Sequence, residues 1–265
     1  MAGATESMEI ELPCGSVHLK RWIPARPPNE VPVVLLHDSL GSVDLWRDFP
    51  ERLATTLSRC VIAYDRLGFG RSSPRLDRPS LHFIEEEASA TFPCLKERLG
   101  LGRYILLGHS VGGAMSIVIA AGDPDCQGVV TMAAQAAVEE LTVASIARAK
   151  RMFAGPGQLE RLARWHGVRA PWVLRAWTEV WLDPAFASWS LADCQKRVHC
   201  PVLAIHGLRD EYGSTTFAQS IAATTTGGSE VLLVDAGHMV HREKTAEVLE
   251  AIRSFLHRVT GASTP

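Results

Sequence analysis

Short apolar runs separated by helical stretches constrain the fold of this chain most strongly. Each run is rich in Val, Ile and Leu and ends at glycine or a polar residue, as a strand buried on both faces does. Six such runs occur, at 31–38, 60–70, 103–110, 128–134, 200–207 and 230–237. Helical patterns lie between or after them, at 46–58, 83–100, 111–122, 215–225 and 243–259. This alternation predicts an α/β fold, in which helices flank both faces of a mainly parallel sheet.

Two segments depart from this alternation. Residues 9–24 have the pattern of an antiparallel hairpin at the edge of the sheet. Residues 136–191 look helical and contain five of the seven tryptophans. An all-helical insertion between two strands is typical of a lid over an active site, although surface helices packed on the sheet are the alternative. We therefore expect a core domain at 1–135 and 192–265 and a helical cap at 136–191.

The bulk composition is that of an ordinary globular protein. The 265 residues are 46% hydrophobic and 21% charged, which argues against disorder. A formal net charge of -2 gives no electrostatic footprint for nucleic acid. The start of the chain lacks the features of a signal peptide, and no apolar run has membrane-spanning length. Six scattered cysteines without a C-x-x-C pair predict reduced thiols and no zinc site.

These observations predict a cytoplasmic protein, either a monomer or a homodimer. Its expected partner is a small-molecule substrate, with no nucleic acid and no membrane involved.

The stretch "ILLGHSVGGAM", residues 105–115, places one serine among three glycines and a histidine. Ser110 follows a predicted strand at its carboxyl end, where ligands bind to parallel sheets. The pattern G-x-S-x-G is that of a nucleophile elbow, a sharp turn that exposes the serine oxygen above the sheet. Gly108 and Gly112 fit this role because a side chain at either position would collide with a neighbouring element. The start of the following helix favours a developing anion.

A serine hydroxyl is a poor nucleophile unless a base takes its proton and an acid orients that base. "LAIHGLRDEYG" places Asp210 just past one predicted strand, and "VLLVDAGHMVHRE" places His238 just past the next. The chain order Ser, Asp, His is that of the elbow-containing hydrolases. All three residues are expected on the same edge of the sheet.

Five motifs resemble those of the α/β-hydrolase superfamily, namely "VVLLHDSLGS", "AYDRLGFGRSS", "LLGHSVGG", "CPVLAIHGLRDE" and "DAGHMVHRE". The resemblance extends from residue 31 to about residue 259 and is closest to small single-domain serine hydrolases with a helical cap. It implies that Ser110 is the nucleophile, Asp210 the orienting acid and His238 the general base. The neighbouring Glu211 and His241 fit the family spacing less well. Such a triad needs no metal and no cofactor.

The resemblance also implies an oxyanion hole, with one departure from the family pattern. One donor is expected to be the backbone N–H of Val111. The other should follow "VVLL", where relatives usually have His-Gly-x and this chain has His37-Asp38-Ser39. We expect the Ser39 N–H to take this role, with its hydroxyl as a further donor. The Asp38 carboxylate is expected to point away from the hole or to be hydrogen-bonded.

The predicted function is a serine hydrolase that cleaves an ester, or a related acyl bond, of a small apolar or aromatic substrate through an acyl-enzyme on Ser110. The residues expected to line its pocket are Trp165, Trp172, Trp177, Trp181, His109 and Met239. Within the fold, the alternatives are a carbon–carbon bond or amide hydrolase of ring-cleavage products and a cofactor-free perhydrolase or haloperoxidase. A non-catalytic ligand-binding protein is an alternative of another class.

Four arginines of the predicted cap have two interpretations. They either anchor a substrate carboxylate or form a solvated helix face, the commoner case. These residues are Arg161, Arg164, Arg169 and Arg175.

Overall fold

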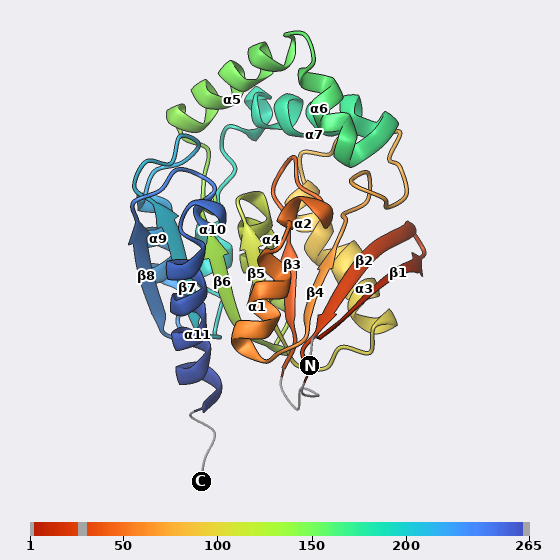
Figure 1. Ribbon diagram of the computed structural model, residues 1–265. Helices are drawn as coiled ribbons and strands as arrows, with labels where there is room; N and C mark the ends of the chain where they lie inside the picture. Colours follow the sequence, from red (N-terminus) through yellow and green to blue (C-terminus); the bar gives the residue numbers. More distant parts are fainter. Residues whose placement is uncertain (1–2, 26–30, 262–265) are drawn as a thin grey trace.

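In the computed structural model, which describes residues 3–25 and 31–261, the strands form one sheet (Figure 1). Eight strands of this described part are arranged in the order β1-β2-β4-β3-β5-β6-β7-β8. Neighbours from β4 to β8 are parallel, whereas β1 pairs antiparallel with β2, and β2 with β4. The bounds are β1 (Ala4–Leu12), β2 (Gly15–Ile23), β3 (Val33–Leu36), β4 (Val61–Tyr64), β5 (Tyr104–His109), β6 (Cys126–Met132), β7 (Val202–Gly207) and β8 (Ser229–Val234).

The predicted fold class is confirmed, including the antiparallel hairpin at one edge of the sheet. Strands β3 to β7 are buried as expected, because helices cover both of their faces. The prediction that residues 230–237 form a fully buried strand was wrong. Residues 230–234 belong to β8, which is the opposite edge of the sheet and is buried only at Val234, and the strand ends there rather than at residue 237.

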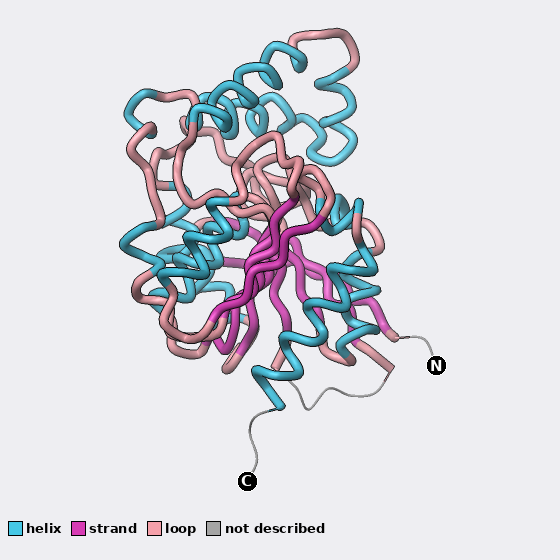
Figure 2. Tube along the Cα trace, turned by 90° about the vertical axis from the view of Figure 1, so that its left-hand side faces the viewer, coloured by secondary structure: helices cyan, strands magenta, loops and turns pink. Residues whose placement is uncertain are grey.

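Helices pack on the two faces of the sheet in separate groups (Figures 1 and 2). The hydrophobic core on one face includes residues of α1, α10 and α11, and the core on the other includes residues of α3, α4 and α9. None of the helices within the described residues is both long and apolar enough to cross a membrane. The bounds are α1 (Phe49–Leu57), α2 (Phe83–Glu86), α3 (Phe92–Arg98), α4 (Val111–Gly122), α9 (Thr216–Thr224), α10 (Val240–Glu243) and α11 (Thr245–Gly261).

The stretch predicted as one helix at 83–100 is divided. A wider turn, η2 (Glu87–Thr91), separates α2 from α3. Pro93 follows this turn at the start of α3 and has no N–H to donate to the preceding carbonyls. A local change of helical pitch before a proline is a common way to accommodate that missing bond.

Helices inserted between β6 and β7 lie beyond the end of the sheet at which β5 leads into α4 (Figure 1). Residues 140–181 form the three long helices of this insertion, and the wider limits of 136–191 stay a prediction. The bounds are α5 (Glu140–Phe153), α6 (Gln158–His166), η3 (Gly167–Arg169), α7 (Ala170–Trp181), η4 (Pro184–Phe186) and α8 (Ala192–Gln195).

Helix α7 is amphipathic and turns its aromatic side toward the rest of the protein. Trp172, Trp177 and Trp181 are all buried on this side, at 9%, 9% and 3% exposure. The indole Nε1 of Trp172 donates a hydrogen bond to the Asp77 carbonyl at 3.0 Å. Trp172 also packs against Phe69, with ring centroids 5.7 Å apart. These contacts fix α7 over the loop that follows β4, so that the insertion forms a roof above the carboxyl ends of the strands.

Candidate active site

The serine at the end of β5 lies in a sharply bent turn. Ser110 has φ 56° and ψ -125°, a backbone conformation that residues other than glycine rarely adopt. A Cβ at Gly108 would lie 2.1 Å from the Gly112 carbonyl oxygen. A Cβ at Gly112 would lie 2.1 Å from the Leu36 carbonyl oxygen. The two glycines therefore permit the close packing of α4 on β3 and β5 that holds Ser110 in this conformation.

Replacement of Gly112 should be strongly destabilising for this reason. In Gly112→Ala the new methyl group meets backbone rather than a movable side chain. We expect the free energy of unfolding to fall by about 3 kcal/mol, the upper range for overpacking. Urea denaturation monitored by tryptophan fluorescence measures this change.

The matched control is Gly122→Ala at the other end of α4, where a Cβ would meet nothing within 4 Å. This variant should change stability by less than about 1 kcal/mol. Equal losses in the two variants would contradict the steric explanation.

His238 and Asp210 meet beside this turn. The Nδ1 atom of His238 lies 2.9 Å from both carboxylate oxygens of Asp210. Asp210 also accepts a hydrogen bond from the Tyr212 N–H at 2.8 Å, and its Oδ2 lies 3.1 Å from His206 Nε2. Because the carboxylate accepts only, His238 carries its proton on Nδ1 and leaves Nε2 free as an acceptor.

The electrostatics of this pair follow from the same contacts. Burial alone would raise the pKa of Asp210, but hydrogen bonds from His206 and His238 hold it well below its usual range. Burial alone would lower the pKa of His238, whereas the bond to Asp210 raises it above the ordinary value for histidine. The charges of Asp38 and Glu211 act in the same direction. The arrangement therefore stabilises an imidazolium at His238.

The Ser110 hydroxyl bonds to a residue that the sequence did not point to. Its Oγ donates to Gln135 Oε1 at 3.2 Å, and among the described residues it has no hydrogen bond to His238. Gln135 is buried in the loop that follows β6, two residues after Ala133 with its positive φ of 50°. Its position just past a predicted strand was the available signal, because that places it on the same edge of the sheet as Ser110.

Asp38 is hydrogen-bonded, as expected from the sequence. Its Oδ1 accepts from the Leu40 N–H at 2.8 Å, and its Oδ2 lies 3.3 Å from His109 Nδ1. Although burial alone would raise the pKa of Asp38, these bonds and the neighbouring histidines hold it far below its usual range. Within the described part of the chain, the backbone N–H groups of Ser39 and Val111 have no hydrogen-bond acceptor.

A cavity of about 330 Å³ lies between the end of the sheet and α7, and both Ser110 and His238 reach its wall. Of the six residues predicted to line the pocket, it contains Trp177, Trp181 and Met239. Apolar and polar side chains share the rest of the wall, including Leu45, Ile146, Gln135, Asp38, Ser39, Glu211 and Arg242.

The other predicted pocket residues lie elsewhere. Trp172 lines a second, adjoining cavity. His109 is buried beneath the site, where its Nε2 donates to the His238 carbonyl at 3.0 Å. Trp165 lines neither cavity, because α6 turns Leu162 and His166 inward and leaves Trp165 half-buried.

The four cap arginines reach neither cavity. Arg161, Arg164 and Arg175 are exposed. Arg169 donates to the backbone carbonyls of Gly70 and Ser72, so its side chain ties the cap to the loop after β4. The structure therefore favours their role as a solvated helix face and a structural contact. Across the described residues, no group of three or more His, Cys, Asp or Glu side chains is arranged to hold a metal ion.

Comparison with known proteins agrees with this architecture. The family model described as alpha/beta hydrolase fold matches residues 31–198. A proline iminopeptidase of Lactobacillus crispatus (strain ST1) is 33% identical over 113 residues, which are 43% of this chain and 38% of that protein. This chain therefore matches less than half the length of that relative.

Solved structures resemble this one over nearly the whole chain. The proline iminopeptidase of Mycobacterium smegmatis gives a TM-score of 0.74 at 21% identity and covers 98% of this chain and 100% of its own. The carboxylesterase CesB (YbfK) of Bacillus subtilis gives 0.70 at 18% identity, covering 96% and 92%. Identities this low establish a shared fold alone. With the family model matching more than half of its length, the chain belongs to the alpha/beta hydrolase fold family.

Proposed function

We propose that this protein is a serine hydrolase that cleaves an ester bond through an acyl-enzyme on Ser110. The observation that carries the proposal is the meeting of three features at one cavity. Ser110 is held in a strained turn on its wall, His238 lies on the same wall, and Asp210 holds the other ring nitrogen of His238 at 2.9 Å. A nucleophile, a base and an orienting acid are what acyl transfer requires.

In the first half of the reaction, Ser110 Oγ attacks the carbonyl carbon of the ester while His238 Nε2 takes the hydroxyl proton. The backbone N–H groups of Ser39 and Val111 stabilise the resulting oxyanion, since neither has another acceptor among the residues that the structure describes. His238 then gives its proton to the leaving alcohol, and the carbon–oxygen bond of the ester breaks. In the second half, a water repeats these steps and releases the acid with free Ser110.

Gln135 has a role in the resting state of this mechanism. Its amide oxygen accepts the Ser110 hydroxyl, so the hydroxyl must rotate toward His238 before the proton moves. Such catalytic hydrogen bonds often form only once substrate is bound. The wall of the cavity, with Trp177, Trp181 and Ile146, favours a small apolar or aromatic substrate.

The test is the intact mass of the protein after incubation with a reactive 4-nitrophenyl alkylphosphonate. We expect a single adduct in the wild type, because only an activated serine displaces the nitrophenolate, and none in Ser110→Ala. Turnover of 4-nitrophenyl esters with graded acyl chains would then define the substrate size. A folded wild-type protein without an adduct would overturn the proposal.

Hydrolysis of an amide is the second candidate. The carboxylates of Asp38 and Glu211 line the same cavity as Ser110, and such groups attract the amino group of an amino-acyl substrate. Relatives in the comparisons include proteins named proline iminopeptidase. Hydrolysis of amino-acyl 4-nitroanilides at rates above those of 4-nitrophenyl esters would favour this candidate over the esterase.

A further inference from the structure

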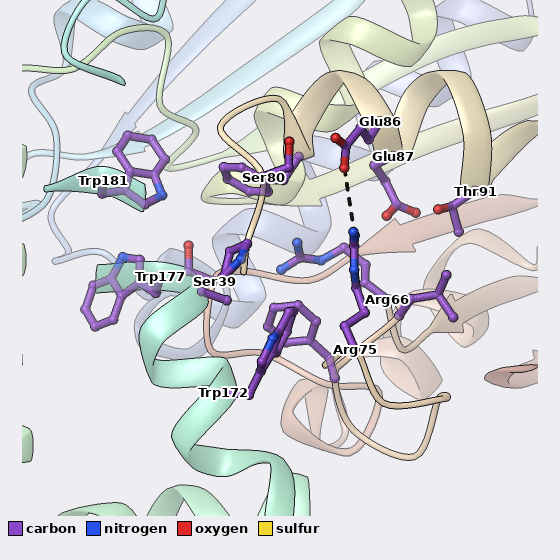
Figure 3. Close-up of a pocket in the computed structure, with 15 residues that line it drawn as sticks. Ser39, Arg66, Arg75, Ser80, Glu86, Glu87, Thr91, Trp172, Trp177 and Trp181 are labelled. Atoms are coloured by element: carbon purple, nitrogen blue, oxygen red, sulfur yellow. Dashed lines mark ion pairs between the residues drawn. The ribbon is translucent and has the colours of Figure 1, made fainter. Parts of the chain in front are cut away.

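The second cavity adjoins the one that contains Ser110. The two share Ser39, Trp177 and Trp181, and Figure 3 shows Ser39 between Trp177 and Arg66. The second cavity is narrow, with a volume of about 40 Å³. A single water needs roughly 10–15 Å³ by this measure, so the space suits a group of about three heavy atoms. A carboxylate has this size.

Arg66 brings a buried positive charge to this cavity. Its side chain lines the wall although the residue is only 4% exposed. The backbone N–H of Arg66 donates to His37 Nε2 at 3.1 Å, and the guanidinium packs over the Phe69 ring at 4.2 Å from its centroid. The position of the guanidinium is thus fixed from both ends of the residue.

The guanidinium has more donors than partners. Its Nη2 donates to the Asp38 carbonyl at 2.9 Å, and its buried Nε has no partner among the described residues. A guanidinium carries five N–H donors in a planar fork, so this one retains the capacity for further bonds. Buried cations are normally paired, because an unpaired charge loses its hydration without compensation.

The other charged groups of the cavity are already engaged. Glu87 Oε1 accepts the Tyr64 hydroxyl at 2.7 Å. Arg75 pairs with Asp77 at 3.0 Å and lies 3.8 Å from Glu86, the contact drawn in Figure 3. Arg66 is attracted by the charge of Glu87, but no carboxylate of the described chain lies within ion-pair distance of it. Arg66 is therefore the group of this cavity that an anionic ligand would complete.

We propose that Arg66 is a specificity-determining residue that binds a carboxylate of the substrate. The substrate is then an ester that carries a carboxylate at one end, with its scissile carbonyl at Ser110 and the carboxylate in the second cavity. Ser39 lies where the two cavities meet, so one molecule can occupy both. This inference rests on the proposed hydrolase function and names the substrate class of that same site.

The test compares esters that differ only in charge. Mono-4-nitrophenyl glutarate and the 4-nitrophenyl ester of glutaramic acid place a carboxylate or its neutral amide on the acyl side. The pair 4-acetoxybenzoate and 4-acetoxybenzamide does the same on the alcohol side. In the wild type we expect kcat/KM to favour the carboxylate member of one pair by about 10- to 100-fold, the effect of a charge-assisted hydrogen bond. In Arg66→Met that preference should disappear. Because Arg66 also holds the Asp38 carbonyl, which belongs to the same peptide unit as the Ser39 N–H, both esters of a pair should be hydrolysed more slowly, and the ratio of kcat/KM within the pair isolates the effect of charge.

Arg75→Met is the matched control, because Arg75 lines the same cavity but already has carboxylate partners. It should leave the charge preference unchanged. If Arg66→Met does not fold, Arg66→Lys keeps the charge and loses the planar fork, and it should reduce the preference without abolishing it. A wild type without charge preference in either pair would overturn the inference, and so would a preference that survives replacement of Arg66.

A binding measurement without turnover tests the carboxylate site independently of the proposed hydrolase activity. Trp172, Trp177 and Trp181 line the cavity, so their fluorescence reports its occupation without any turnover. Glutarate should change the emission of Ser110→Ala, and glutaramide or sodium chloride at equal ionic strength should not. A protein without a phosphonate adduct that still binds glutarate through Arg66 would refute the hydrolase and keep the carboxylate site. A phosphonate adduct without glutarate binding or charge preference would support the hydrolase and refute the carboxylate site.

Discussion

His238→Ala should lower kcat for a 4-nitrophenyl ester by about a million-fold, since a nucleophile without its base is nearly inert. The expectation follows from the position of His238, whose Nδ1 is held by Asp210 while its other nitrogen faces the cavity of Ser110. Rates this low are measured with enzyme in excess over substrate, in samples that are stopped at intervals over several hours. Circular dichroism of the same preparation checks that the variant is folded, because the His238 ring is largely buried against His109 and Tyr212.

The non-additivity of this loss is the sharper part of the prediction. Ser110→Ala should cost about as much as His238→Ala, and the double variant should cost no more than either, because the two groups act as one unit. Multiplication of the two losses in the double variant would mean that they contribute separately. That outcome would contradict a proton transfer between them.

His241 provides the control for the identity of the base. Its ring is buried between Trp46, Phe49 and His109, and burial holds its pKa well below the ordinary value. His241→Phe preserves this packing and should retain activity to within about tenfold. A loss in His241→Phe as large as that in His238→Ala would assign the base to the wrong histidine.

The fold was predictable because the residue patterns of the single strands and helices agree with their burial in the assembled sheet. Strands β3, β5 and β7 are short apolar runs that both faces of the sheet bury, and the helices between them have matching patterns. The error at β8 has a physical cause. An apolar run such as "EVLLV" is compatible with a central strand, and only the topology, which places β8 at the edge, leaves it half-exposed.

The site was predictable only as far as its residues follow strands. Ser110 directly follows β5, and Asp210 and His238 lie in the loops just after β7 and β8, so parallel pairing brings all three to one edge of the sheet. Gln135 follows β6 in the same way, but a glutamine carries no motif that would single it out. Nothing in the sequence gives the partner of the Ser110 hydroxyl, because that depends on a rotamer in the folded state.

The packing of the insertion decided what the sequence left open. Predicted pocket residues on α6 and α7 separated because only one side of each helix faces the sheet, which turns Trp177 inward and leaves Trp165 aside. The residue proposed to bind a carboxylate is likewise Arg66 of the core domain rather than an arginine of the cap. The cap arginines are exposed or bound to backbone, whereas Arg66 lies in the loop after β4, within the motif "AYDRLGFGRSS" of the family resemblance.

The largest effect expected beyond the nucleophile and base is that of Asp210→Asn. Its carboxylate fixes the proton of His238 on Nδ1 and stabilises the imidazolium that forms when Ser110 is deprotonated. An asparagine of the same shape loses the charge and can present its NH₂ group, which favours the wrong tautomer. We expect kcat to fall by about 10⁴-fold, the effect of the equivalent change in other serine triads.

The pH profile tests the same contact in the wild type. His238 must be neutral to accept a proton, and its pKa is raised above the ordinary 6.5 by Asp210, Asp38 and Glu211. Activity should therefore rise with pH along an acid limb whose midpoint in kcat/KM lies above 6.5. Removal of the Asp210 charge makes the imidazolium less stable, so in Asp210→Asn this midpoint should move to lower pH while the maximal rate falls.

Glu211→Gln distinguishes charge from positioning in this profile. Glu211 accepts a hydrogen bond from the backbone N–H of His238 at 3.2 Å. Among the described residues, it forms no hydrogen bond with the ring nitrogens of His238. Its replacement should lower the midpoint slightly and leave the maximal rate near that of the wild type. A wild-type midpoint at or below 6.5, or one that Asp210→Asn does not move, would mean that the contact at 2.9 Å does not govern the base. A lowered midpoint together with an unchanged maximal rate would instead mean that Asp210 supplies charge without orienting the ring.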